Sequence, residues 1–215
     1  MKIMKIAAIH VDPQNGFTEK CPLELAVAGA LGIIKPLNEM FTFADVNVVS
    51  QDWHPEDAEY HATEDKPMGT AINLPNADIT WNRHCVANTF GADLVEGLPA
   101  ISEFDLSVRK GEEKDCHPYG ALWRDYAKKR STGIVEFLED QNVNTVLVGG
   151  LALDFCVRET VLELKAVGFN PILVLDATRP VFPENTQKTI DELVAAGAIV
   201  VQTLEDAKLH IAEVA

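Results

Sequence analysis

The chain has 215 residues, of which 47% are hydrophobic and 24% are charged, and its formal net charge is −15. This length and composition fit one α/β domain over residues 1–215 with one sizeable core. The negative charge argues against nucleic acids and anionic membranes as partners. No apolar run approaches the roughly 20 residues of a membrane span, and the N-terminus lacks a signal-peptide pattern, so we expect a cytoplasmic protein. The four widely spaced cysteines are expected to be free thiols.

Apolar runs predict six strands, and segments of helical periodicity lie between them. The strands are expected at residues 5–11, 46–50, 104–109, 145–149, 171–175 and 198–201, and the helices at 25–43, 120–141, 155–167, 184–196 and 205–214. The first helix is expected to begin late because glycines and Pro36 interrupt it, and Ser131 is a candidate N-cap within the second. This alternation predicts an α/β fold, a doubly wound, mainly parallel six-stranded sheet with helices on both faces.

The end of the second predicted strand carries a candidate metal site. Asp52 and His54 are two residues apart, so in an extended chain their side chains share one face. A carboxylate and an imidazole placed in this way can bind one divalent metal, and His84 could be a third ligand. Three protein ligands would leave positions on the metal for water or substrate. An Asp and a His two residues apart are, however, more often hydrogen-bonding neighbours than metal ligands. Residues 55–88 have little periodicity, and a loop of this length is usually functional.

The segment 148–160 predicts a strand end, a glycine turn and a helix with Cys156 in its first turn. A helix N-terminus favours a thiolate, and its free N–H groups can hold an oxyanion. Most free cysteines are inert apolar residues, however. A nucleophile is favoured because Asp12, Asp52 and Lys110 follow three other strands. The carboxyl ends of parallel strands share one edge of the sheet, although Asp12 alone could be a turn residue and Lys110 a solvated one.

Short motifs across nearly the whole chain match one known family in its order. They are residues 11–17 (VDPQNGF), 21–22 (CP), 25–27 (LAV), 50–55 (SQDWHP), Trp81, 84–86 (HCV), 91–92 (GA), 110–111 (KG) and 150–157 (GLALDFCV). With these motifs the chain resembles the nicotinamidases of the isochorismatase-like cysteine hydrolase superfamily. Residues 82–83, 87–90 and 112–122 depart from the family pattern. Because these departures lie near the substrate entrance, they bear on substrate identity more than on the chemistry.

The resemblance implies a catalytic triad of Asp12, Lys110 and Cys156. It also implies a cis peptide bond between Leu151 and Ala152, with the amides of Ala152 and Cys156 directed at the oxyanion.

A divalent metal is likewise implied, most often Zn²⁺ with Fe²⁺ or Mn²⁺ as alternatives, on Asp52, His54 and His84. His61 and Glu64 compete for a further ligand position.

The resemblance also places three aromatic side chains around the substrate ring: Phe17, Trp81 and, by approximate correspondence, Tyr119. Cys116 and His117 form a second conceivable metal pair, which nothing else in the sequence supports. Asp154 is interpreted as a helix cap, and His10 and Cys85 as packed core residues.

The implied function is metal-dependent hydrolysis of nicotinamide to nicotinic acid and ammonia through a cysteine thioester, as part of NAD salvage. The alternatives are another small amide or ureido substrate and, from a different class, a non-catalytic binding or scaffold protein. The presence of all three triad residues counts against a scaffold. A small molecule is the expected partner, and the sequence leaves open whether the chain forms a homo-oligomer.

Overall fold

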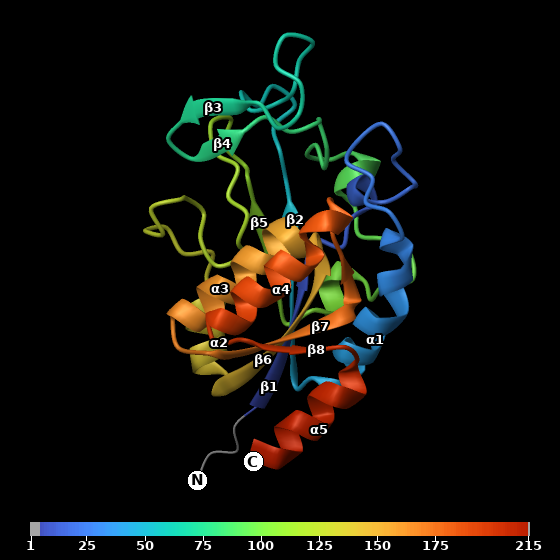
Figure 1. Ribbon diagram of the computed structural model, residues 1–215, viewed down its shortest axis with the longest axis vertical. Coiled ribbons are helices and arrows are strands. Elements are labelled where there is room, and N and C mark those ends of the chain that lie inside the picture. The colour runs from blue at the N-terminus through green and yellow to red at the C-terminus, as the bar shows by residue number, and fades with distance from the viewer. Residues whose placement is uncertain (1–4, 215) are drawn as a thin grey trace.

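The computed structural model of the protein describes residues 5–214, and a twisted six-stranded sheet lies at its centre (Figure 1). The strands of this sheet are β1 (Lys5–Val11), β2 (Val46–Asp52), β5 (Leu106–Lys110), β6 (Val143–Leu151), β7 (Asn170–Arg179) and β8 (Ile199–Val201). Their spatial order is β5-β2-β1-β6-β7-β8, and every neighbouring pair is parallel. The predicted doubly wound parallel sheet is therefore confirmed.

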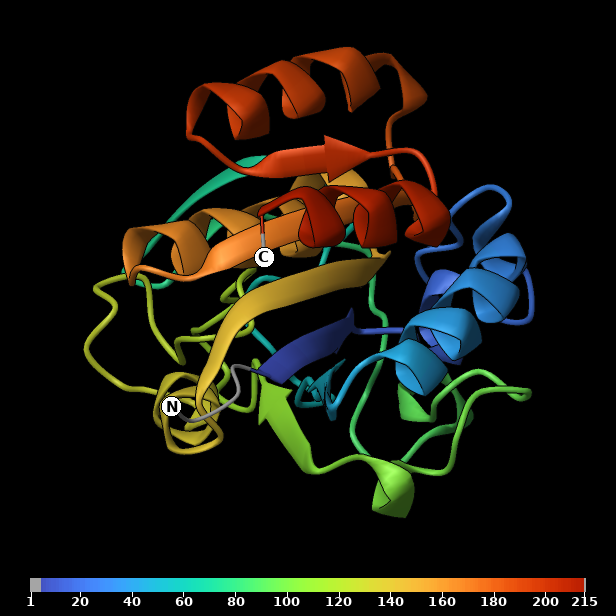
Figure 2. The ribbon, with the colours of Figure 1, turned by 90° about the horizontal axis from the view of Figure 1, so that it is seen from below.

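Helices cover both faces of the sheet because alternate strand residues point to opposite sides. The helices are α1 (Ile34–Phe43), α2 (Ile134–Asp140), α3 (Arg158–Ala166), α4 (Thr186–Ala195) and α5 (Leu204–Val214). Ala7 and Ile9 of β1 belong to the cluster with buried residues of α2, α3 and α4, whereas Ala8 belongs to the cluster with α1 and α5. Figure 2 shows the sheet between the α1 side and the α2 side.

The strand order reverses direction at the centre of the sheet, between β1 and β6. In open α/β sheets, ligands bind in the crevice at the carboxyl ends of the strands at such a switch point. Gly150 of β6 makes this close pairing possible: its φ is +123°, and a Cβ there would overlap the carbonyl oxygen of Val11. Asp12 follows β1 directly, and β6 leads into the turn that holds Cys156.

The predicted helix over residues 120–141 is wrong for most of its length, since only α2 is helical. The carboxylate of Asp125 accepts the backbone amides of Lys129 and Arg130, which closes a loop in place of a helical turn. The predicted N-cap is also wrong. Gly133, at φ +95°, precedes α2, and its amide donates to the hydroxyl of Ser131 at 2.9 Å.

Three further elements differ in extent from their predictions. The segment 55–88 contains a small antiparallel pair, β3 (Ala71–Leu74) and β4 (Ala77–Ile79), which lies beyond the carboxyl end of β2 at the top of Figure 1. The helix expected from residue 155 begins as a π-helical turn, Leu153–Val157, and continues as α3. Strand β7 continues to Arg179, so Asp176 lies inside it. Within residues 5–214, no helix is long and apolar enough to cross a membrane.

Candidate active site

The carboxyl ends of β1, β5 and β6 bring Asp12, Lys110 and Cys156 together. The Nζ atom of Lys110 lies 3.0 Å from Oδ2 of Asp12 and 3.5 Å from Sγ of Cys156. All three side chains are almost completely buried. These three residues lie far apart in the sequence, and only the parallel sheet places an acid, a cation and a thiol within contact of one another.

Asp12 is held in place by the neighbouring strand. Its φ is +45°, in the left-handed region that few residues other than glycine adopt. Its amide donates to the carbonyl of Ser50 at 3.1 Å, and the Ser50 hydroxyl donates to its Oδ1 at 2.6 Å. Burial raises the pKa of Asp12 to about 6, against the opposing effect of Lys110. A carboxylate with a raised pKa is a better proton acceptor than an ordinary one.

Lys110 carries the buried positive charge of the site. Burial lowers its pKa, but Asp12 and Asp52 outweigh that effect and hold the pKa well above the ordinary value. The side chain is therefore an ammonium. Its Nζ also donates to Asp52 and, at 3.3 Å, to the carbonyl of Pro118.

Cys156 lies in the π-helical turn before α3. Burial raises the pKa of its thiol well above the ordinary value, and this exceeds the lowering by Lys110. The resting side chain is thus a thiol, and the thiolate expected at a helix N-terminus has to be generated by a base. The expected cis peptide bond between Leu151 and Ala152 is present.

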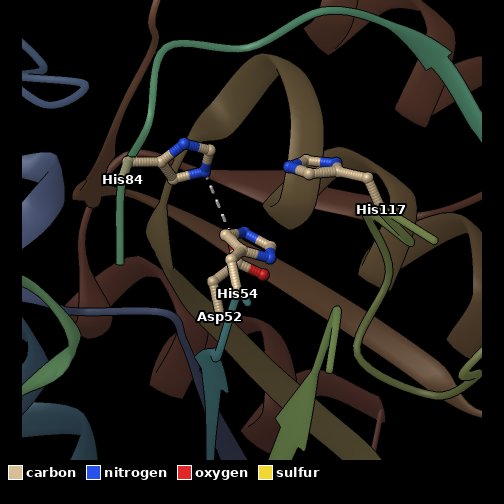
Figure 3. A group of neighbouring side chains, drawn as sticks. All are labelled: Asp52, His54, His84 and His117. Carbon is tan, nitrogen blue, oxygen red and sulfur yellow. Dashed lines mark ion pairs between the residues drawn. The ribbon is translucent and has the colours of Figure 1, made fainter. Parts of the chain in front are cut away.

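A second group of buried side chains, Asp52, His54, His84 and His117, lies beside this trio (Figure 3). One potential ligand atom from each residue lies within 4.8 Å of all the others. Oδ2 of Asp52 is 3.4 Å from Nε2 of His54 and 3.8 Å from Nε2 of His84. Burial alone would raise the pKa of Asp52, but Lys110 and His54 hold it well below the ordinary value, so the carboxylate is ionised.

The hydrogen bonds of this group leave ligand atoms free. Among the described residues, Oδ2 of Asp52 and Nε2 of His54 are buried without a hydrogen-bond partner. Nδ1 of His84 donates to the Asn82 carbonyl at 2.6 Å, and Nδ1 of His54 lies 2.7 Å from the Tyr60 hydroxyl. Such contacts orient metal-binding imidazoles and leave Nε2 for the ion. Since unpaired buried polar atoms are costly, these residues fit a bound cation.

His117 is the member of this group that the sequence analysis dismissed. Its position in the loop that follows β5 was a usable signal, because β5 pairs with β2 and Asp52 lies opposite Lys110, the last residue of β5. Cys116, its expected partner, is not in the group, and neither are His61 and Glu64.

One cavity is lined both by the thiol and by residues of the metal-binding group. Phe17, Trp81 and Tyr119, the three aromatic residues expected at a substrate ring, all line it. Nε1 of Trp81 donates to the Tyr119 hydroxyl at 3.1 Å, which in turn donates to Asp78 at 2.7 Å. Apolar and aromatic side chains make up most of the cavity lining, and Cys156, Asp52, His84 and His117 line it as well.

Comparison with known proteins agrees with this arrangement. The model of the isochorismatase domain matches residues 7–205. The chain belongs to the isochorismatase family. Within this family, a nicotinamidase of Acinetobacter baylyi is 34% identical over 197 residues, which are 89% of each protein.

Two solved structures of the isochorismatase fold are also similar to this chain. A nicotinamidase–pyrazinamidase of Acinetobacter baumanii has a TM-score of 0.85 at 28% identity and covers 95% of this chain and 99% of its own. A pyrazinamidase of Pyrococcus horikoshii in complex with zinc has a TM-score of 0.72 at 29% identity and covers 92% and 98%.

Three residues that the sequence analysis placed outside the catalytic and metal sites, Asp154, His10 and Cys85, have a structural role. The interpretation of Asp154 as a helix cap is wrong: its carboxylate accepts the amides of Val181 and Phe182, so it fixes a segment next to the cavity. His10 is buried, with Nε2 3.4 Å from the side-chain oxygen of Asn47, and Cys85 is also buried. Both are core residues, as predicted.

Proposed function

We propose that the protein is a nicotinamidase, which hydrolyses nicotinamide to nicotinic acid and ammonia through a thioester on Cys156. The observation that carries this proposal is one aromatic cavity that is lined both by Cys156, the thiol of the Asp12–Lys110–Cys156 trio, and by members of the buried Asp–His group. Similarity to nicotinamidases over most of the chain supports the same activity. We further propose that residues 1–215 act as a single domain in the cytoplasm, in NAD salvage.

The reaction begins with proton transfer from the Cys156 thiol to Asp12, and the thiolate attacks the carboxamide carbon. Amides of Ala152 and Cys156 hold the resulting oxyanion, and the Lys110 ammonium stabilises the charged trio. Asp12 then returns the proton to the leaving nitrogen as the C–N bond breaks, which releases ammonia and leaves the thioester. Water, deprotonated by Asp12, attacks the thioester carbon and releases the acid together with the free thiol.

Asp52, His54 and His84 would hold a divalent ion, for which Zn²⁺ is the first choice because a similar pyrazinamidase is in complex with zinc. Fe²⁺ and Mn²⁺ are the alternatives. The chemistry that such an ion supplies is a Lewis-acid contact for a ring nitrogen, which would orient the substrate. Phe17, Trp81 and Tyr119 would contact the aromatic ring and exclude water from the cavity.

A different small amide is the second candidate substrate, because residues 82–83 and 87–90 depart from the family pattern near the cavity. A scaffold role is disfavoured by the intact, mutually contacting trio.

Ammonia release from nicotinamide tests the proposal, with benzamide, which lacks the ring nitrogen, as a comparison. We expect wild-type protein to turn over nicotinamide far faster than benzamide, and Cys156→Ala to be inactive while its metal content is unchanged. Cys21→Ala, at a half-buried cysteine outside the cavity, is the matched control and should stay active. After acid quenching, the intact mass of the wild-type protein should include a nicotinoyl adduct. Turnover of nicotinamide by Cys156→Ala would refute the mechanism, and turnover of other amides alone would refute the substrate.

A further inference from the structure

We propose that His117 is a fourth protein ligand of the metal ion, beside Asp52, His54 and His84. This inference rests on the metal site in the proposed function. The motifs of the sequence assign His117 no role, and it lies 33 positions beyond His84 in a loop without regular structure.

The first observation is that the imidazole of His117 lacks polar partners. The residue is 3% exposed, and among the described residues neither ring nitrogen has a hydrogen-bond partner. An imidazole always carries at least one N–H or lone pair that needs a partner, and a buried ring without one is costly. His10 is buried to the same degree, yet its Nε2 has a partner in Asn47. Ligation to a metal ion would supply the partner that His117 lacks.

The second observation is the spacing of the four ligand atoms. A tetrahedral ion with bonds of about 2.0–2.1 Å has its ligand atoms about 3.4 Å apart. Oδ2 of Asp52 lies 3.4 Å from Nε2 of His54 and 3.8 Å from Nε2 of His84. One ligand atom from each of the four residues lies within 4.8 Å of the other three. Figure 3 shows the imidazoles of His84 and His117 facing each other across the space above Asp52 and His54. A small contraction around an ion would complete a tetrahedral shell.

The third observation is that the ring of His117 is fixed by stacking. It lies nearly parallel to the Trp81 ring, at 12° and 5.8 Å between centroids, and to the His54 ring, at 22° and 4.8 Å. Its backbone amide donates to the carbonyl of Asn76 at 2.7 Å. The side chain is thus placed toward the ion before any ion binds, which lowers the entropic cost of ligation.

One consequence concerns the substrate. Four protein ligands complete a tetrahedral shell, whereas the sequence alone predicted three ligands and an open position. A ring nitrogen then has to bind as an additional ligand or replace His117.

The test measures metal binding in the full-length protein after dialysis against a chelator. We expect His117→Ala and the shape-conserving His117→Gln to bind Zn²⁺ at least about 100-fold more weakly than wild type. Even the loss of a hydrogen-bond partner that orients a ligand lowers metal affinity about 10–100-fold. The visible absorption of bound Co²⁺ should lose the intensity typical of a tetrahedral site. His61→Ala is the matched control, because Nε2 of His61 is also unpartnered but lies outside the ligand group. It should leave affinity and spectrum unchanged.

Circular dichroism of the metal-free variants is the check that they remain folded. Unchanged Zn²⁺ affinity and Co²⁺ spectrum in both folded His117 variants would overturn the inference, as would a wild-type protein that binds neither ion. If the wild type binds Zn²⁺ through His117 but does not hydrolyse nicotinamide, the proposed substrate fails while the ligand assignment stands.

Discussion

Lys110 pairs through Nζ with the carboxylate of Asp52, the same residue whose other oxygen belongs to the metal-binding group. The register of β2 and β5 sets this contact, because Asp52 and Lys110 are directly opposite each other. The ammonium also lies 3.0 Å from Asp12. One buried cation therefore links the base of the catalytic trio with the metal site, and the charges of the two halves depend on each other.

The first prediction concerns this shared charge. Lys110→Met should destabilise the metal-free protein by about 3–5 kcal/mol, because it leaves buried carboxylates without their cation. Asp12→Asn removes one of these carboxylates, so the double variant should be less destabilised than the sum of the single variants by at least about 1 kcal/mol. Urea unfolding of the four proteins measures the difference. Strict additivity would mean that Asp12 and Lys110 do not interact energetically.

The second prediction concerns the hydrogen bond from Ser50 to Asp12. This bond favours the ionised carboxylate and so lowers the pKa of Asp12, which burial raises to about 6. Asp12 has to be ionised to accept the thiol proton. Ser50→Ala should therefore shift the acidic limb of kcat/KM toward higher pH, by about one pH unit. Ser107→Ala, an exposed serine in β5, should leave the profile unchanged. A profile unaltered in Ser50→Ala would argue against Asp12 as the base.

The third prediction concerns the glycine after Lys110. Gly111 has φ +70°, and a Cβ there would lie 2.5 Å from Cε1 and Nδ1 of His54. Gly111→Ala should displace the imidazole and weaken Zn²⁺ binding at least about tenfold, as loss of a ligand-orienting contact does. Gly133 has φ +95° with open space around it, so Gly133→Ala controls for backbone strain alone. Titration with Zn²⁺ separates the two effects. Equal losses in both variants would mean that strain, and not contact with His54, is responsible.

The fourth prediction concerns Glu163 of α3, which is buried and accepts the backbone amide of Leu122 at 3.0 Å. Burial raises its pKa from 4.5 to about 7. Between these values the folded protein binds a proton that the unfolded chain releases, so this group's contribution to stability falls as pH rises through that window. Glu163→Gln should remove the effect.

Unfolding free energies measured from pH 4.5 to 8 test this prediction. Relative to wild type, Glu163→Gln should gain up to about 3 kcal/mol across that range. Glu159→Gln, at a more exposed position of the same helix, should gain far less. A constant difference between Glu163→Gln and wild type would contradict the raised pKa.

The local signals in the sequence were sufficient to predict the strands of the sheet. Strand β1 was predicted with its observed bounds, and the other strands within a few residues, because buried parallel strands are short continuous apolar runs. The region 120–141 was mispredicted because its apolar periodicity resembles a helix. The side chain of Asp125 and the antiparallel bridge between Trp123 and Ser131 hold most of it in a loop.

The sequence by itself identified Asp12, Asp52, Lys110 and Cys156, since each lies in a contiguous motif or directly at a strand end. Only the tertiary structure decided that Lys110 contacts both acids and that burial keeps Cys156 a thiol, because register and solvent exclusion involve segments far apart in the chain. It also brought His117 into the metal-binding group. No motif marks that residue; its one signal in the sequence is its place in the loop after β5, and its neighbours come from β2, from the loop of His84 and from Trp81.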